Sequence, residues 1–249
     1  MSRTTWRAVL LVPGLAVVLG MLVWAFAGLP GFGDRIGDYG RLINQLAQSQ
    51  RHVTNFVTAV MFDYRGIDTM VEEFILFASV TGVALLLRST REIEEHPPHD
   101  EVTSDAVRTA GGLLAPVLLL FGLWTVSFGY ITPGGGFQGG VLASAGALLL
   151  WLAGSYRIFQ RSAPETLLDA AEGLGAAGYV AVGLLGMAAG AEFLTNTLGL
   201  GSAGTLASGG TIAALNWVAG VEVTAAFLLL YREFTQEYIE TFRRSEARA

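Results

Sequence analysis

The sequence predicts an all-α, polytopic membrane protein with about six transmembrane helices and both termini in the cytoplasm. Of the 249 residues, 52% are hydrophobic and only 14% are charged, and the mean hydropathy is +0.51. Soluble domains carry about 25% charged residues. A chain this apolar has too little polar surface to cover a water-soluble globule, so its natural solvent is lipid.

Six apolar runs are long enough to cross a bilayer, which takes about 20 helical residues. Each run must be helical, because lipid offers no hydrogen bonds to an open backbone. The first run follows Arg3 and Arg7 and has no clear small-x-small cleavage site, so we expect a retained helix rather than a cleaved signal peptide. The expected spans are residues 7–27, 70–88, 110–129, 138–157, 172–195 and 212–231.

The placement of arginine predicts the orientation. The chain has no lysine, so all 15 basic residues are arginines. With the N-terminus inside, the cytoplasmic segments hold eleven of them and the outer segments hold four, namely Arg35, Arg41, Arg51 and Arg65. Positive charge gathers on the cytoplasmic side of membrane proteins. Both termini are therefore expected in the cytoplasm.

A charged segment divides the chain. Residues 89–109 hold six carboxylates and the pair Pro97-Pro98, a composition typical of a solvated linker. We therefore expect a two-helix module over residues 1–88, a cytoplasmic linker over 89–109 and a four-helix domain over 110–249.

A glycine-rich motif lies between the third and fourth spans. Part of it satisfies G-x-G-x-x-G, but a dinucleotide site needs a preceding strand, and here spanning helices flank the motif on both sides. Proline followed by glycines breaks a helix and frees backbone groups, which at membrane depth must be buried in protein or line a wet cavity. A tight outer hairpin is the simpler interpretation, although an aromatic and an amide inside it disfavour a plain hairpin. The motif consists of Pro133, Gly134, Gly135, Gly136, Phe137, Gln138, Gly139 and Gly140.

A second group of polar residues precedes the second span. Asp63 and Arg65 can pair with each other or with partner proteins, and Asp68 or Thr69 can cap the following helix. Glu72 would then lie in or near the first turn of that helix, where the helix dipole favours a carboxylate. Two interpretations stay open, namely interfacial capping and an uptake site for protons or cations at the membrane edge.

Two further candidate acids lie within predicted spans. Glu222 is near the middle of the sixth span, where a lone charge costs about 2.5–3.5 kcal/mol on insertion scales and indicates function by default. Glu192 is near the outer end of the fifth span, where it can be functional or merely interfacial. Both are candidates for an ion or proton path, together with Glu72, Asp63, Asp68 and Arg65.

No catalytic residue, metal site or cofactor is expected. The absence of cysteine excludes disulfides and thiolate–metal sites. His52, His96 and His99 form no metal-ligand pattern, and no serine–histidine–aspartate arrangement fits this topology. A P-loop needs a lysine, which the chain lacks, and no basic aromatic patch indicates nucleic acid.

The motif at 133–140, set between two spans, resembles the signature of the MnhB family, the B-type subunits of the Mrp-type multisubunit Na+/H+ antiporters. The resemblance covers about residues 110–240 and includes a final helix containing Asn216 and Glu222. The family often has a histidine three residues before the motif's proline, and this chain has Tyr130. A titrating histidine is therefore lost, which argues against a proton-relay role for that position.

The front half resembles a different piece of the same machinery. Residues 60–72 are similar to the C-terminal tail of the large A-type antiporter subunit, a module that also occurs as a small subunit of membrane-bound hydrogenases. Glu72 falls at the acidic position of that module's Asp-Thr-x-x-Glu pattern, which makes it the first candidate for a transport residue. The chain then resembles a fusion of this tail with an MnhB-type protein.

The resemblance implies a component of a cation/proton antiporter in the bacterial inner membrane, without catalytic turnover of its own. Its partners would be the lipid bilayer and the antiporter subunits of types A, C, D, E, F and G, with Na+ and H+ as transported ions. Two alternatives stay open. One is a membrane subunit of a redox-driven or complex I-like relative such as a membrane-bound hydrogenase, and the other is a purely structural scaffold.

Overall fold

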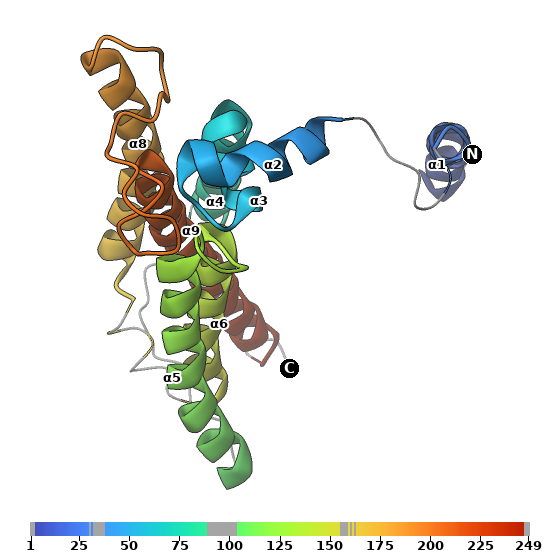
Figure 1. The fold of residues 1–249 in the computed structure, drawn as a ribbon. Coiled ribbons are helices and arrows are strands. Elements are labelled where there is room, and N and C mark those ends of the chain that lie inside the picture. The colour runs from blue at the N-terminus through green and yellow to red at the C-terminus, as the bar shows by residue number, and fades with distance from the viewer. Residues whose placement is uncertain are drawn as a thin grey trace. The chain divides into compact units, whose positions relative to one another are not determined.

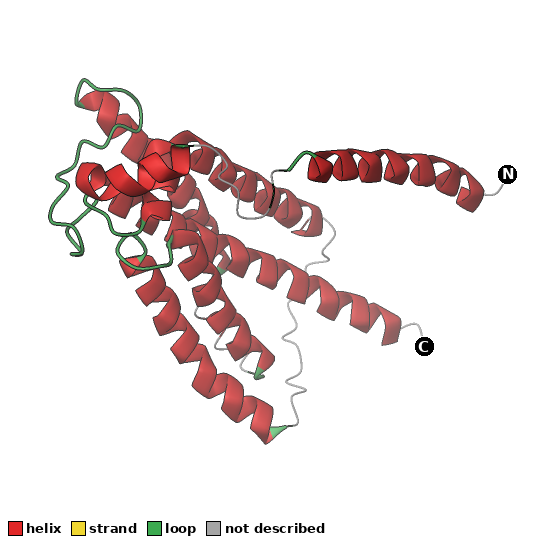
Figure 2. Cartoon of the chain, turned by 45° about the vertical axis from the view of Figure 1, so that its right-hand side comes forward, coloured by secondary structure: helices red, strands yellow, loops and turns green. Residues whose placement is uncertain are grey.

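The computed structural model describes residues 3–29, 31, 38–88, 104–154, 159, 161 and 163–246. Every regular element in this part of the chain is a helix (Figures 1 and 2), which confirms the all-α prediction. The chain divides into two compact units, Met1–Leu42 and Ile43–Ala249, which are described separately.

The first unit contains α1 (Arg3–Ala27) and the start of α2 (Tyr39–Arg51). From Leu11 to Ala27, α1 is apolar and exposed all round, as expected of a helix surrounded by lipid. In contrast, α2 is amphipathic, and the part of it in the second unit buries Ile43 and Ala47, which are four residues apart on one face.

Four helices are long and apolar enough to cross a membrane, and two further apolar helices are shorter. Each of the six overlaps one of the predicted spans, which confirms a polytopic membrane protein. In the second unit the apolar helices are α4 (Gly66–Arg88), α5 (Asp105–Phe128), α6 (Gly136–Leu152), α8 (Glu165–Ala188) and α9 (Thr211–Glu246).

Several predicted bounds are wrong. The second span begins at Gly66 and not at residue 70, because a short helix α3 (Phe56–Ala59) and a π-helical segment η1 (Val60–Tyr64) lead into it. The third span begins at Asp105 and not at residue 110, because the side chain of Ser104 caps α5. The fourth span ends at Leu152 and not at residue 157, because Gly154 has a φ of +82°.

The fifth span is displaced by seven residues and the sixth is longer than predicted. The fifth covers Glu165–Ala188 rather than 172–195, because Arg88 pairs with the acidic side chains of its first turns. Glu192 therefore lies in the loop after α8 and not in a span. At 36 residues, α9 is about 54 Å long, well beyond a hydrocarbon core of about 30 Å.

The central element of the second unit is α9. In its most apolar window 61% of the residues are buried, compared with 17–33% in the other three long apolar helices. On one side it packs against α6, which in turn packs against α5. On the other side it packs against α4 and α8 (Figure 1). A side chain buried on α9 is therefore surrounded by protein and not by lipid.

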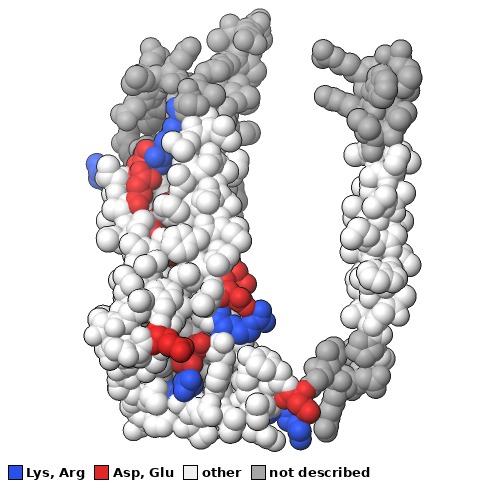
Figure 3. Space-filling model, turned by 90° about the horizontal axis from the view of Figure 1, so that it is seen from above, with Lys and Arg blue, Asp and Glu red and all other residues white. Residues whose placement is uncertain are grey.

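The two ends of this bundle differ. At one end, here called the hairpin end, residues 52–64 meet the turn at 129–135 and the loop at 189–210. At the other, called the Arg88 end, the last turn of α4 meets the first turns of α8. On the face drawn in Figure 3, charged side chains gather in a few clusters separated by uncharged surface.

Residues 43–88 belong to the same compact unit as 104–246. The predicted linker 89–109, with His96 and His99, lies outside the described residues up to position 103, and residues 105–109 form the start of α5. The division of the chain into two modules at this linker stays a prediction.

Candidate ion path

The polar residues before α4 do not pair as one group. Asp63, in the π-helical segment, accepts a hydrogen bond from Nε of Arg51 at 2.5 Å, and only 7% of its side chain is exposed. Nδ2 of Asn196 donates to the other oxygen of Asp63 at 3.3 Å. Arg65 pairs instead with Asp68 on an exposed surface. The buried Asp63 therefore joins α2, η1 and the loop after α8.

The helix α4 begins at Gly66, so Asp68 lies in its first turn rather than at a cap. The capping residue of this region is Asn55, whose side-chain oxygen accepts from the N–H groups of Val57 and Thr58 at the start of α3. The hydroxyl of Thr69 donates to the carbonyl oxygen of Met61 at 2.7 Å. This bond ties α4 to the π-helical segment, a kind of helix that is rare and frequently found at functional sites.

The glycine-rich turn is a docking point for the front half of the chain. Nδ2 of Asn55 donates to the carbonyl oxygens of Gly129, Thr132 and Gly134 at 2.6, 3.1 and 3.2 Å. Thr58 adds a bond to the carbonyl oxygen of Gly129 at 2.8 Å. The backbone groups freed by the proline and glycines are thus satisfied by side chains more than 70 residues earlier.

A buried asparagine of α9 caps the helix that follows the turn. Oδ1 of Asn216 accepts from the N–H of Gly136 at 2.7 Å, and its Nδ2 donates to the carbonyl oxygen of Val126 at 2.5 Å. A β-carbon added at Gly136 would lie 2.2 Å from the backbone oxygen of Asn216, and one added at Gly140 would lie 2.9 Å from Val223. The motif glycines let α6 lie against α9.

Tyr130 closes the hairpin end. It is 3% exposed, and its hydroxyl donates to the carbonyl oxygen of Leu206 at 2.6 Å. Burial raises the pKa of this hydroxyl, so the group remains a protonated donor at neutral pH. Tyr130 acts here as a structural tie between the turn and the loop before α9.

The motif and the acidic start of α4 share one pocket. A partly open pocket of about 250 Å³ is lined by Met61, Glu72, Glu73, Phe137 and Gln138. The two motif residues that disfavoured a plain hairpin thus face the acids of α4. Glu72 is exposed and its neighbour Glu73 is 4% exposed, so the pocket has a carboxylate at its mouth and another in the protein interior.

Glu222 is fully buried in the middle of the bundle. None of its surface is exposed, and neither carboxyl oxygen has a hydrogen-bond partner among the described residues. The backbone of α8 passes directly over it, since a β-carbon added at Gly175 would lie 2.4 Å from Cβ of Glu222. Glu172, three residues earlier on the same face of α8, is also buried.

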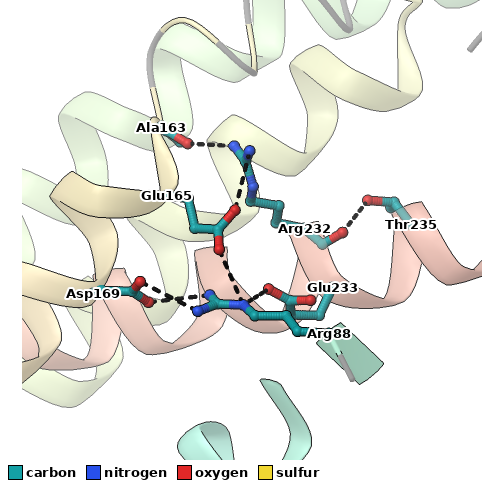
Figure 4. Close-up of polar contacts among 7 residues, drawn as sticks. All are labelled: Arg88, Ala163, Glu165, Asp169, Arg232, Glu233 and Thr235. Carbon is teal, nitrogen blue, oxygen red and sulfur yellow. Dashed lines mark hydrogen bonds and ion pairs between the residues drawn. The ribbon is translucent and has the colours of Figure 1, made fainter. Parts of the chain in front are cut away.

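A cluster of five charged side chains, the Arg88 cluster, holds the other end of α4, α8 and α9 together (Figure 4). Arg88 contacts Glu233 at 2.8 Å and both Glu165 and Asp169 at 3.1 Å. Arg232 contacts Glu165 at 3.5 Å. Three carboxylates share two guanidinium groups. Within the described residues, no group of three or more histidine, aspartate or glutamate side chains is arranged to hold a metal ion.

The structure thus places Glu222 in the core formed by α4, α8 and α9, and Glu72 at the edge of this core. The hairpin end holds Asp63, Asp68 and Arg65. Glu192 is exposed in a loop. Sequence reasoning missed Glu73, Glu172 and Glu233. The spacing of acids in the sequence could have identified Glu172 and Glu233. Glu172 continues an i, i+4, i+7 stripe of acids on α8, and Glu233 lies three helical turns beyond Glu222.

The sequence of the chain is similar to a protein family and to two known proteins. Residues 106–229 match the family of domains related to the MnhB subunit of Na+/H+ antiporters. The B-type subunit of a Na+/H+ antiporter of Bacillus subtilis is 33% identical over 102 residues, covering 41% of this chain and 71% of that protein. An uncharacterized protein of Methanocaldococcus jannaschii is 28% identical over 217 residues, covering 75% of this chain and 81% of that protein.

Two solved structures share the fold. A chain of the membrane-bound sulfane sulfur reductase, an archaeal respiratory membrane complex, is 31% identical with a TM-score of 0.72, covering 92% of this chain and 98% of that one. A chain of the Mrp complex from Dietzia has a TM-score of 0.70 at 23% identity, and its similarity covers 94% of this chain and 26% of that one.

Proposed function

Because the chain belongs to the MnhB family of Na+/H+ antiporter subunits, we propose that it is a membrane subunit of a multisubunit monovalent cation/proton antiporter. It contributes to assembly of the complex and to the path of the transported ion or proton. The chain has no catalytic turnover of its own and acts only as part of the complex.

One observation carries this proposal, namely the pocket that joins two distant parts of the chain. Glu72 and Glu73 come from the front half, and Phe137 and Gln138 come from the glycine-rich motif. Acidic residues within membrane-spanning segments are costly, and they therefore face the protein interior or water rather than lipid. A carboxylate at the mouth of such a pocket can receive a proton or a cation from the adjoining surface.

The front half acts in this proposal as a module like the tail of the A-type antiporter subunit, joined to the MnhB-like part through the linker at 89–109. Asp63 and Asn55 support the union, because they bind η1 and α3 to the loop after α8 and to the glycine-rich turn. The partners are the antiporter subunits of types A, C, D, E, F and G. The complex lies in the bacterial inner membrane and transports Na+ and H+.

A redox-driven complex is the second candidate, favoured by the similarity to a chain of the membrane-bound sulfane sulfur reductase. The two candidates differ in what purifies with the chain. An antiporter complex contains only membrane subunits, whereas a redox-driven complex also contains iron–sulfur subunits. Mass spectrometry of the complex isolated from its native membrane distinguishes them.

Replacing Glu72 with glutamine tests the transport role. We expect cation-dependent proton flux in vesicles carrying the whole complex to fall by about tenfold or more, as when a positioned proton-transfer group is lost. The substitution keeps the size of the side chain, so the complex should assemble normally on a native gel. Asp105→Asn, which neutralises an exposed acid at the start of α5, serves as the matched control and should transport like the parent.

Full flux in an assembled Glu72→Gln complex would contradict a transport role for this residue. If Glu222→Gln also retained full flux, the chain would be a scaffold whose partners carry the titrating groups. A parent complex without cation-dependent proton flux would remove the antiporter assignment itself.

A further inference from the structure

Three buried carboxyl groups lack complete hydrogen bonding in the described part of the chain. Glu73 on α4 and Glu172 on α8 are 4% exposed and each has one oxygen without a partner, while Glu222 on α9 is 0% exposed and both its oxygens lack one. An isolated buried charge is costly, so such groups hold a proton or contact another polar group. Their positions on three different helices call for an explanation beyond packing.

These groups lie on helices that pack against one another. Glu73 is buried on α4 and Glu222 on α9, α4 packs against α9, and the two carboxyls are close enough to influence each other. Gly175 of α8 lies against the stem of Glu222, and Glu172 precedes it by three residues on the same face of α8. Asp169, three residues before Glu172, pairs with Arg88. The order therefore runs from the pocket at Glu72 and Glu73, through the middle of the bundle, to the Arg88 cluster.

Helix geometry gives the length of this sequence. Glu73 and Arg88 are fifteen residues apart on α4, a rise of about 22 Å at 1.5 Å per residue. The hydrocarbon core is about 30 Å thick. On α9, Glu222 precedes Glu233 of the Arg88 cluster by eleven residues, a rise of about 16 Å, and on α8 Glu172 follows Asp169 by three residues. The acids therefore extend through much of the membrane's apolar thickness.

We propose that Glu73, Glu222 and Glu172 form a proton relay between the pocket at Glu72 and the Arg88 cluster. The relay rests on the proposed function, which it deepens by assigning the proton to this chain. In each step the O–H bond of one carboxylic acid breaks and an O–H bond forms on the next carboxylate, directly or through one water. One proton moves in each step, and no electron is transferred.

The packing around Glu222 favours a proton over a hydrated cation. Gly175 brings the α8 backbone into contact with the stem of Glu222, so the two helices pack closely beside this carboxyl group. Sodium coordination also needs several oxygens around one point, whereas here the carboxyls come singly from α4, α9 and α8.

The Arg88 cluster gives the relay an exit. The side chain of Asp169 is 44% exposed and that of Glu165 is 35% exposed, so protons arriving at Glu172 reach water through them. Arg88 contacts both of these acids, and Arg232 contacts Glu165. The relay thus ends at side chains that are partly exposed to solvent.

Glu172→Gln tests the relay, because Glu172 is the step between Glu222 and the Arg88 cluster. In the whole complex we expect it to assemble and to lose about tenfold or more of the cation-dependent proton flux. Glu172→Asp keeps the carboxyl but lengthens the gap, so its flux should lie between those of Glu172→Gln and the parent. Asp105→Asn is again the control and should transport like the parent.

Parent-level flux in an assembled Glu172→Gln complex would overturn the relay while leaving the proposed function intact, provided that Glu72→Gln is impaired. If Glu172→Gln failed to assemble, Glu172→Asp would decide. Reduced flux in that complex supports the relay, and parent-level flux contradicts it. Absence of cation-dependent flux in the parent would instead remove the proposed function.

Discussion

Replacing Gly136 with alanine is expected to separate α6 from α9 and to lower the stability and the abundance of the complex. The added β-carbon would lie 2.2 Å from the backbone oxygen of Asn216 and 2.8 Å from the backbone nitrogen of Gly220. Backbone atoms cannot move aside as a flexible side chain can. Overpacking costs about 1–3 kcal/mol, and loss of the bond between the Gly136 N–H and Asn216 leaves buried polar groups unpaired, at about 1–3 kcal/mol more.

The measurement is the thermal midpoint of the purified complex, with its abundance on a native gel. The matched control is Gly173→Ala on α8, where an added β-carbon meets no atom within 4 Å. Alanine is favoured over glycine within a helix by about 0.5–1 kcal/mol, so this variant should be as stable as the parent or slightly more so. Equal midpoints for the two alanine variants would show that α6 does not pack on α9 through Gly136.

Replacing Arg88 with alanine is the second change with a large expected effect. Glu233, whose side chain is 1% exposed, would lose its contact with Arg88, and Glu165 and Asp169 would lose a shared cation. Removing one partner of a buried ion pair costs about 3–5 kcal/mol. Because 30% of the Arg88 side chain is exposed, we expect the lower part of this range, measured as a lower midpoint of thermal unfolding.

Two comparisons separate this effect from a general loss of charge. Arg41→Ala breaks a pair whose side chains are 58% and 83% exposed, and such a surface pair contributes only about 0–1 kcal/mol. In the double variant Arg88→Met with Glu233→Gln, the buried carboxylate goes together with its partner, so its midpoint should lie above that of Arg88→Ala. A double variant less stable than Arg88→Ala would contradict the account of a buried, paired Glu233.

Local patterns in the sequence were sufficient to predict the apolar helices, though not all of their bounds, and to single out one buried acid. Each predicted span corresponds to an apolar helix, since twenty apolar residues in lipid have no alternative to a helix. Glu222 could be identified because an acid is conspicuous in the middle of an apolar run. The proline and glycines of the motif likewise predicted a break between two helices.

The choice between Glu72 and Glu73 could not be made in the same way. Adjacent residues on a helix point about 100° apart, and only the partner helix determines which of them is buried. The resemblance identified Glu72, which lies at the mouth of the pocket, whereas packing against α9 buries Glu73. Both acids belong to one site, in different surroundings.

Contacts between segments far apart in the chain could not be predicted from the sequence either. Asn55 binds carbonyl groups more than 70 residues later, and no local pattern connects these two segments. The acids at the start of α8 were taken for a loop because charge normally marks the end of a span. They lie inside the helix because Arg88, from a helix about 80 residues earlier, neutralises them.

The most direct test of a proton-carrying role for this chain is cation-dependent proton flux in vesicles with Glu222→Gln in the whole complex, measured beside its thermal midpoint. Neither oxygen of Glu222 has a hydrogen-bond partner among the described residues. Glutamine should therefore change the free energy of unfolding by no more than about 1 kcal/mol, and the thermal midpoint should shift by only a few degrees. We predict a flux lower by about tenfold or more in a complex of unchanged stability. Parent-level flux in that complex would contradict the account and assign proton transfer to the partner proteins of the complex.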